Sequence, residues 1–113
     1  MAAGRVAVGG SRHLPARFSL QDEWYNFRTP NTLTTRNKLH ILASMDESTY
    51  APGTGANGVE HPIAWCQAYE GGRSVYTGMG HPAAAWGDSR FLRHVLGGIR
   101  MAAGEDRFEC APA

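Results

Sequence analysis

The sequence predicts an α/β fold, because strand patterns and one amphipathic helix pattern occur along a chain of ordinary globular composition. The clearest strand pattern covers residues 38–45, whose centre is nearly all apolar, as in a strand that is covered on both faces. A hairpin pattern follows at 61–77, and a helix pattern at 88–103. With 113 residues, the chain is long enough for one small domain.

The first part of the chain predicts two shorter strands. Residues 5–9 form a short apolar run that is consistent with a strand. We expect an irregular stretch over 13–21, because Pro15 interrupts any helix there. Three aromatic residues within 22–27 favour a strand, which the turn residues 29–31 would close.

The middle of the chain predicts a strand, a polar loop and a hairpin. Polar residues at 46–50 come directly after the buried strand, where open α/β sheets place their ligand sites. A glycine-containing loop at 51–60 separates them from a second strand at 61–69. We expect a turn at 70–72 and a partner strand at 73–77, which would form an antiparallel pair at or near a sheet edge.

A single helix is predicted near the end of the chain. Asp88 can cap its N-terminus, and Gly104 is a natural residue for its C-terminal cap. Glycines at 97–98 suggest that the helix packs closely on the sheet. Its apolar stripe, at i, i+3 and i+4 spacing, consists of Phe91, Leu92, Val95, Leu96, Ile99 and Ala103.

Charge and hydropathy exclude several functional classes. Lysine and arginine number 11 against 10 acidic residues, and no basic block stands out, so we expect no nucleic-acid partner. No apolar run is long enough to cross a membrane, and residues 1–10 lack the layout of a signal peptide. We expect a soluble chain, although a longer parent protein could carry an export signal elsewhere.

The two cysteines and the histidines give no metal-binding pattern. Cys66 and Cys110 have no CxxC spacing, which argues against a zinc or thioredoxin-like site. They leave a single disulfide open, but the position of Cys66 within a strand favours a small buried thiol. A site made from His61, His81 and a carboxylate is conceivable, but no ligand spacing specifies it, so no metal site is predicted and the cofactor is left unknown.

Five motifs occur in a fixed order along the chain. They are DEWYNF at 22–27, DESTY at 46–50, HPIAWC at 61–66, GRSVYTGMGH at 72–81 and HVLGGIR at 94–100. Their order and spacing resemble those of ThuA-like domains, the trehalose-utilisation family, from about residue 12 to residue 104. The resemblance implies a flavodoxin-like or class I glutamine amidotransferase-like sheet. It further implies that residues 1–104 form the C-terminal portion of such a domain and that 105–113 form a tail.

His81 is the first catalytic candidate. It follows a strand and a Gly-x-Gly sequence, and in amidotransferase-like folds the catalytic histidine lies in a comparable region. Such a histidine can act as a general acid or base, or it can merely stabilise its loop. Asp46 and Glu47 are further catalytic candidates, but adjacent side chains on an extended chain point in opposite directions. One of them could bind a sugar hydroxyl while the other anchors the loop, or both could cap loop amides.

Aromatic and polar side chains near these residues suggest a substrate site. His61 and Trp65 are four residues apart on a predicted strand and therefore share a face. Aromatic rings can stack on sugars, although most of them could simply fill the core, and the loop position of Trp86 favours exposure. The substrate-binding candidates are Glu23, Tyr50, His61, Trp65 and Trp86, and we expect the groups around Tyr50, His61 and His81 to converge at one rim.

The resemblance implies a carbohydrate-metabolism domain that acts on or binds a small-molecule sugar or sugar derivative. Glutaminase activity is not predicted, because Cys66 does not lie on a strand-to-helix elbow. Two alternatives stay open. The chain could be a non-catalytic sugar-binding or accessory module of a larger exported protein, or an inactive truncated fragment that does not fold alone. The sequence does not define the reaction, the cofactor or the oligomeric state.

Overall fold

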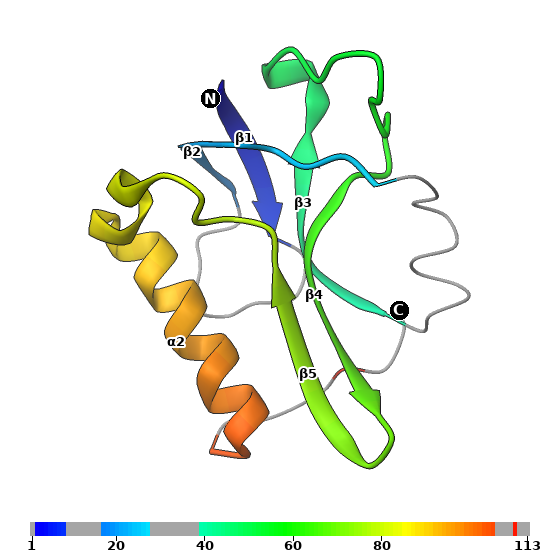
Figure 1. Ribbon diagram of the computed structural model, residues 1–113, viewed down its shortest axis with the longest axis vertical. Coiled ribbons are helices and arrows are strands. Elements are labelled where there is room, and N and C mark those ends of the chain that lie inside the picture. The colour runs from blue at the N-terminus through cyan, green and yellow to red at the C-terminus, as the bar shows by residue number, and fades with distance from the viewer. Residues whose placement is uncertain (1, 9–16, 28–38, 106–109, 111–113) are drawn as a thin grey trace.

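A computed structural model describes residues 2–8, 17–27, 39–105 and 110 of the chain. Five strands form one curled sheet in the order β2-β1-β3-β4-β5, and all four pairings between neighbours are antiparallel (Figure 1). The strands are β1 (Ala2–Val8), β2 (Arg17–Asp22), β3 (His40–Asp46), β4 (Pro62–Tyr69) and β5 (Gly72–Thr77). The sheet packs against a helix, α2 (Ser89–Ala103), so the α/β prediction is confirmed.

The predicted central strand and hairpin are confirmed by β3, β4 and β5. β4 and β5 pair in register from Ala64 and Thr77 to Tyr69 and Gly72. The turn between them has positive φ at Glu70 (48°) and Gly71 (81°), as a tight hairpin turn requires. The polar segment after β3 begins with a short 3₁₀ helix, η1 (Glu47–Thr49), and a second one, η2 (Ala83–Gly87), precedes α2.

The predictions for residues 13–27 were partly wrong. Residues 17–22 form strand β2 instead of an irregular stretch, and the aromatic residues of 23–27 lie in a segment without regular structure. β2 alternates strictly, with Phe18, Leu20 and Asp22 buried between exposed neighbours. The prediction followed Pro15 before the strand and the aromatic residues after it, and therefore overlooked the short alternation between them. The turn predicted at 29–31 lies outside the described residues, as do residues 13–16.

The predicted helix and both of its caps are confirmed. The carboxylate of Asp88 accepts hydrogen bonds from the backbone N–H of Arg90 (2.8 Å) and of Phe91 (3.4 Å). The helix ends at Gly104, which has the left-handed conformation with φ 83°. The broad apolar stripe was only partly right, because Phe91 is buried while three of its members are largely exposed: Leu92, Leu96 and Ile99.

Replacing the helix cap should lower the stability of the domain. We expect Asp88→Ala to reduce the free energy of unfolding by about 1 kcal/mol, and Asp88→Asn to cost less, because asparagine caps about as well as aspartate. Urea denaturation at neutral pH measures both. An equal loss for the two variants would contradict the capping role and assign the effect to the carboxylate charge alone.

The same residue should also contribute to acid sensitivity. The hydrogen bond from Arg90 lowers the pKa of Asp88 to about 2, with the capping amides acting in the same direction and burial opposing them. A carboxylate whose folded-state pKa is depressed stabilises the fold above its unfolded value of 3.8. This contribution is lost as the pH falls through about 2, so Asp88→Asn should flatten the stability profile in that window.

The core lies between the sheet and α2, and a disulfide extends it. Val6, Ile63 and Phe91 are almost fully buried at its centre. Cys66 on β4 forms a disulfide with Cys110, so the prediction of a free buried thiol was wrong and the alternative of a disulfide holds. Among the described residues, no helix is long and apolar enough to span a membrane.

Candidate functional site

Residues 23–27, which we call the crossing segment, run from the end of β2 towards the loop that follows β3 (Figure 1). The Asn26 side chain donates a hydrogen bond to the carbonyl of Pro52 (3.1 Å). The Phe27 N–H donates to the side-chain oxygen of Asn57 (2.8 Å), and the Asn57 amide donates to the Phe27 carbonyl. Side-chain hydrogen bonds of this kind take the place of the sheet pairing that the segment lacks.

The other end of the crossing segment is held at Asp22. Its carboxylate is fully buried and accepts hydrogen bonds from the backbone N–H of Gly80 (2.6 Å) and of His81 (3.2 Å). It also accepts from the N–H of Glu23 at 2.7 Å. The end of β2 is therefore joined directly to the loop after β5.

This junction brings Glu23 and Tyr25 to the His81 imidazole. Nε2 of His81 lies 3.1 Å from Oε2 of Glu23, and Nδ1 lies 3.5 Å from the Tyr25 hydroxyl. The side chains of His81 and Glu23 are 48% and 51% exposed, so a ligand can reach both. A carboxylate at one ring nitrogen orients an imidazole for general acid or base chemistry, and here the other ring nitrogen lies next to the Tyr25 hydroxyl.

A second histidine cluster lies inside the protein. His61 is fully buried, and its Nδ1 lies 2.8 Å from Oε2 of Glu47, while its Nε2 lies 2.7 Å from the Tyr25 carbonyl. Both neighbours offer acceptor oxygens, so either ring nitrogen can donate to the group beside it, and with His61 protonated the contact with Glu47 is an ion pair. The Tyr50 hydroxyl is 3.2 Å from Nδ1. Burial and the charge of Glu47 raise the pKa of Tyr50 to about 12.

Asp46 and Glu47 both bind groups of their own loop. Burial favours the neutral form of Glu47, but the amides of Asn57 and Gly58, both at 2.7 Å, together with His61 lower its pKa overall. Asp46 accepts from the Ser48 hydroxyl (2.5 Å) and the Ser48 amide (3.1 Å), and these bonds lower its pKa. The carboxylates therefore make the loop-capping contacts that the sequence left open as one alternative.

The two predicted tryptophans, Trp65 and Trp86, have different surroundings. Trp65 stacks on Tyr76 with a centroid distance of 4.3 Å, and Phe27 contacts Trp65 edge-on at 5.3 Å. Trp86 is 52% exposed, and its indole N–H donates to the carbonyl of Gly80 (2.9 Å), next to His81. Trp86 lies in the 3₁₀ helix η2 and not in the loop that was predicted. Its half-exposed ring contacts Phe91 and lies beside the His81 loop, whereas Trp65 is partly covered by other rings.

The family to which the chain belongs follows from a comparison with models of known protein families. The family model described as trehalose utilisation, ThuA, matches residues 9–102. The chain belongs to the ThuA family. No curated protein and no solved structure shows a significant match to it.

In this member of the ThuA family, Tyr25 connects the two histidines. Its backbone carbonyl accepts from His61 and its hydroxyl contacts His81. His61 is enclosed by protein, whereas His81 is half exposed, so the two rings have different surroundings. The residues that meet at the surface are Glu23, Tyr25 and His81, with Trp86 beside them.

Sequence reasoning did not select Asp22, Tyr25 or Tyr76. Tyr76 stacks on Trp65, and burial, with a smaller contribution from Tyr25, raises the pKa of its phenol. All three residues lie within the motifs that resemble ThuA-like domains, and this membership was the available signal. Their roles depend on contacts between residues far apart in sequence, which the motifs do not show.

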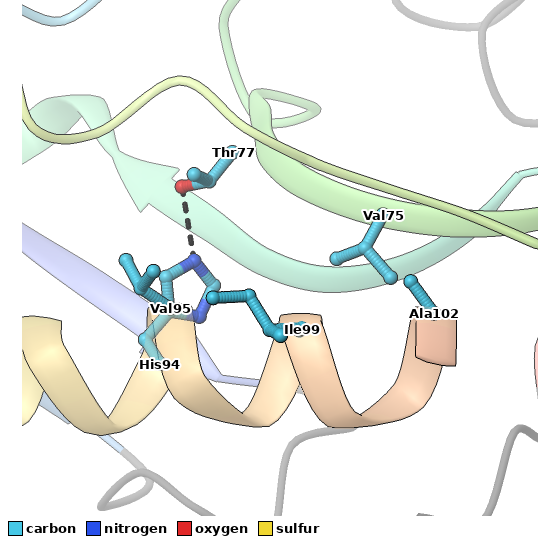
Figure 2. A pocket seen from close by; sticks show the side chains of 7 residues that line it. Val75, Thr77, His94, Val95, Ile99 and Ala102 are labelled. Atoms are coloured by element: carbon cyan, nitrogen blue, oxygen red, sulfur yellow. Dashed lines mark hydrogen bonds between the residues drawn. The ribbon is translucent and has the colours of Figure 1, made fainter. Parts of the chain in front are cut away.

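A pocket of about 220 Å³ lies elsewhere in this ThuA-family fold, between β5 and α2 (Figure 2). Its walls are almost entirely apolar, and the polar groups drawn in it, Thr77 and His94, are hydrogen-bonded to each other at 2.9 Å. A sugar needs several hydrogen-bonding partners, so this lining suits one poorly. None of the predicted site residues lines the pocket.

Metal ligands do not gather in the part of the structure that is described. Within residues 2–8, 17–27, 39–105 and 110, no three side chains of the types His, Cys, Asp and Glu are grouped so that they could hold an ion. His81 and Glu23 form a pair of potential ligands without a third in that range.

Proposed function

We propose that this ThuA-family chain acts on or binds a sugar or sugar derivative at the surface around His81. The observation that carries the proposal is the contact between the half-exposed His81 imidazole and the Glu23 carboxylate. Trehalose utilisation, the description of the matching family, supports a carbohydrate as the ligand class. As the finer part of the proposal, residues 1–104 are the C-terminal portion of a class I glutamine amidotransferase-like domain and 105–113 are its tail. The antiparallel pairing of the described strands does not match the parallel sheet of a flavodoxin-like fold.

In this proposal each exposed group has a separate task. Glu23 orients the His81 ring, which accepts a proton from a sugar hydroxyl or returns one. The Tyr25 hydroxyl lies next to the other ring nitrogen, and the half-exposed ring of Trp86, which packs against Phe91, offers a surface on which a sugar ring can stack. Glu47 acts indirectly in this proposal. It contacts the His61 ring, and His61 contacts the backbone carbonyl of Tyr25, so Glu47 helps to keep Tyr25 in place.

Binding without chemistry is the second candidate, and the arrangement of carboxylates favours it over glycoside hydrolysis. Hydrolysis of a glycosidic bond ordinarily uses two carboxylates that face the same bond. Asp46 and Glu47 are both engaged by their loop, which leaves Glu23 as the carboxylate that contacts His81. A proton-transfer step at one hydroxyl, or simple retention of the sugar, needs only the groups that are present.

The two candidates can be separated with trehalose and a panel of other disaccharides as probes. Incubation followed by NMR of the sugar detects chemical change, and calorimetric titration detects binding. If the chain is an enzyme, His81→Gln should reduce turnover by about 100-fold or more with an unchanged melting curve. If it only binds sugar, no product forms, and Trp86→Ala should weaken affinity.

Tyr69 provides the matched control for the aromatic substitution. It is a similarly exposed aromatic residue, at the far end of β4, and it makes no contact with His81 in the structure. Tyr69→Ala should therefore leave sugar affinity unchanged. If the unaltered chain neither converts nor binds any sugar of the panel, the proposed function is wrong.

A further inference from the structure

We infer that Asp22 is a positioning residue that sets the geometry between Glu23 and His81. The inference deepens the proposed function, because it concerns the same surface and gives the His81–Glu23 pair a fixed support. Asp22 contacts neither an exposed ligand surface nor the reacting atoms, since its side chain is fully buried. It acts through the backbone of the two residues that the surface presents.

A single carboxylate binds the backbone of both members of the pair. Oδ1 of Asp22 accepts from the N–H of Glu23 at 2.7 Å and from the N–H of His81 at 3.2 Å. Oδ2 accepts from the N–H of Gly80 at 2.6 Å. Glu23 and His81 are 58 residues apart in sequence, so their side chains meet only if something joins the end of β2 to the loop after β5. Asp22 is that junction.

The chemistry of the junction requires a carboxylate. Three N–H groups converge on two oxygens, and a buried carboxylate is stable in such a setting because each bond is charge-assisted. An asparagine in the same place would offer one acceptor oxygen and would turn two N–H donors of its own towards backbone donors. Asp22→Asn therefore preserves the size of the side chain while removing at least one of the three bonds.

Packing fixes the loop from the opposite side. Gly80 has φ 103°, and a Cβ built there would lie 2.6 Å from the ring of Phe91. The backbone at Gly80 is thus confined between the Asp22 carboxylate and a buried aromatic ring. With Asp22 intact, the exposed side chains of Glu23 and His81 project from a rigid base. Without the Asp22 carboxylate, the loop loses these backbone hydrogen bonds, and the distance between the Glu23 and His81 side chains is no longer fixed.

NMR of the full chain, without ligand, tests this inference. The probe is the displacement of the His81 ring signals that Glu23→Gln causes, because this displacement reports the contact between the two side chains. We expect a clear displacement in the otherwise unaltered chain and its loss in the Asp22→Asn background. Asp46→Asn is the matched control, since Asp46 also accepts a backbone N–H but does not contact the pair. It should leave the displacement unchanged.

A purely structural role for Asp22 makes a different prediction. In that case Asp22→Asn lowers the melting temperature, while Glu23→Gln still displaces the His81 signals by the full amount, and the inference is wrong. If Asp22→Asn does not fold, amide hydrogen exchange in the unaltered chain decides the matter. The Gly80 and His81 amides should be protected, and exchange as fast as that of an open loop would contradict the junction.

The outcome is independent of the proposed function. A trehalose titration, run on the same samples, reports whether the surface binds the sugar. Loss of the Glu23-dependent displacement in Asp22→Asn, together with no response to any sugar, would sustain the positioning role and reject the sugar site. Full displacement in the Asp22→Asn background, together with sugar binding, would reject the positioning role and sustain the sugar site.

Discussion

Removal of the Cys66–Cys110 disulfide should lower the free energy of unfolding by about 4 kcal/mol, if the chain-entropy account of cross-links applies. The two cysteines are 44 residues apart, so the bond closes a long loop in the unfolded chain and restricts the conformations available to it. Both residues are buried in the folded protein, where the link joins β4 to Cys110. A loss of this size is a large fraction of the total stability of a small domain.

Urea denaturation with and without a thiol reductant measures this contribution. The unaltered chain should unfold at a lower urea concentration when reductant is present. The double variant Cys66→Ala/Cys110→Ala should have the same reduced stability in both conditions, because it has no bond to lose. If the reductant leaves the unfolding midpoint of the unaltered chain where it was, the disulfide contributes nothing to stability under those conditions.

The disulfide also illustrates which features a sequence can reveal. Local signals were sufficient for β3, for the β4–β5 hairpin and for α2 with both of its caps, because each rests on residues close together in sequence. The bond between Cys66 and Cys110 depends on how the whole sheet places two distant residues. No spacing rule for two cysteines could choose between a bond and two separate thiols.

Strand β2 was misplaced for a related reason. Aromatic enrichment drew the prediction to residues 22–27, but β-propensity is largely a measure of how a side chain fits its surroundings. The aromatic residues of 23–27 pack across other elements, as Phe27 does on Trp65. The strand itself ends with Asp22, whose burial makes sense only when its three backbone donors are in place.

The functional site shows the same limit. Sequence reasoning selected His81, Glu23 and Trp86, which the fold brings to one exposed region. It did not select Tyr25, whose contacts with two histidines, 36 and 56 residues further along the chain, appear only in the fold. The motifs indicated which segments matter, while the fold determined which of their side chains face one another.

The buried pair of Glu47 and His61 should give the second large effect on stability. Glu47→Gln removes the carboxylate that lies against the fully buried His61 ring, and breaking a buried ion pair from one side typically costs about 3 kcal/mol or more. The glutamine can still accept a backbone N–H, but it leaves His61 without a charge partner. The His61 ring then faces a neutral amide at Nδ1 and the Tyr25 carbonyl at Nε2.

Asp46→Asn provides the matched control, because it alters the neighbouring carboxylate by the same chemistry. Asp46 bonds to Ser48 at the surface and contacts no buried charge, so its substitution should have a much smaller effect. Urea denaturation of the two variants at neutral pH measures the difference. Equal losses for both would show that the loop, and not the buried ion pair, determines the cost.

The pH dependence of stability separates the charge of Glu47 from its shape. The backbone amides of Asn57 and Gly58 and the contact with His61 outweigh burial and depress the pKa of Glu47 below 4.5. A depressed carboxylate stabilises the folded state above its unfolded pKa, and this contribution disappears as the pH falls through the folded value. The unaltered chain should therefore lose stability below about pH 4.5, whereas Glu47→Gln, already without the charge, should lose less over the same interval.

Parallel acid profiles for the two proteins would show that the charge of Glu47 does not stabilise the folded state. The crossing segment would then owe its position to the Asn57 contacts and to Asp22 alone.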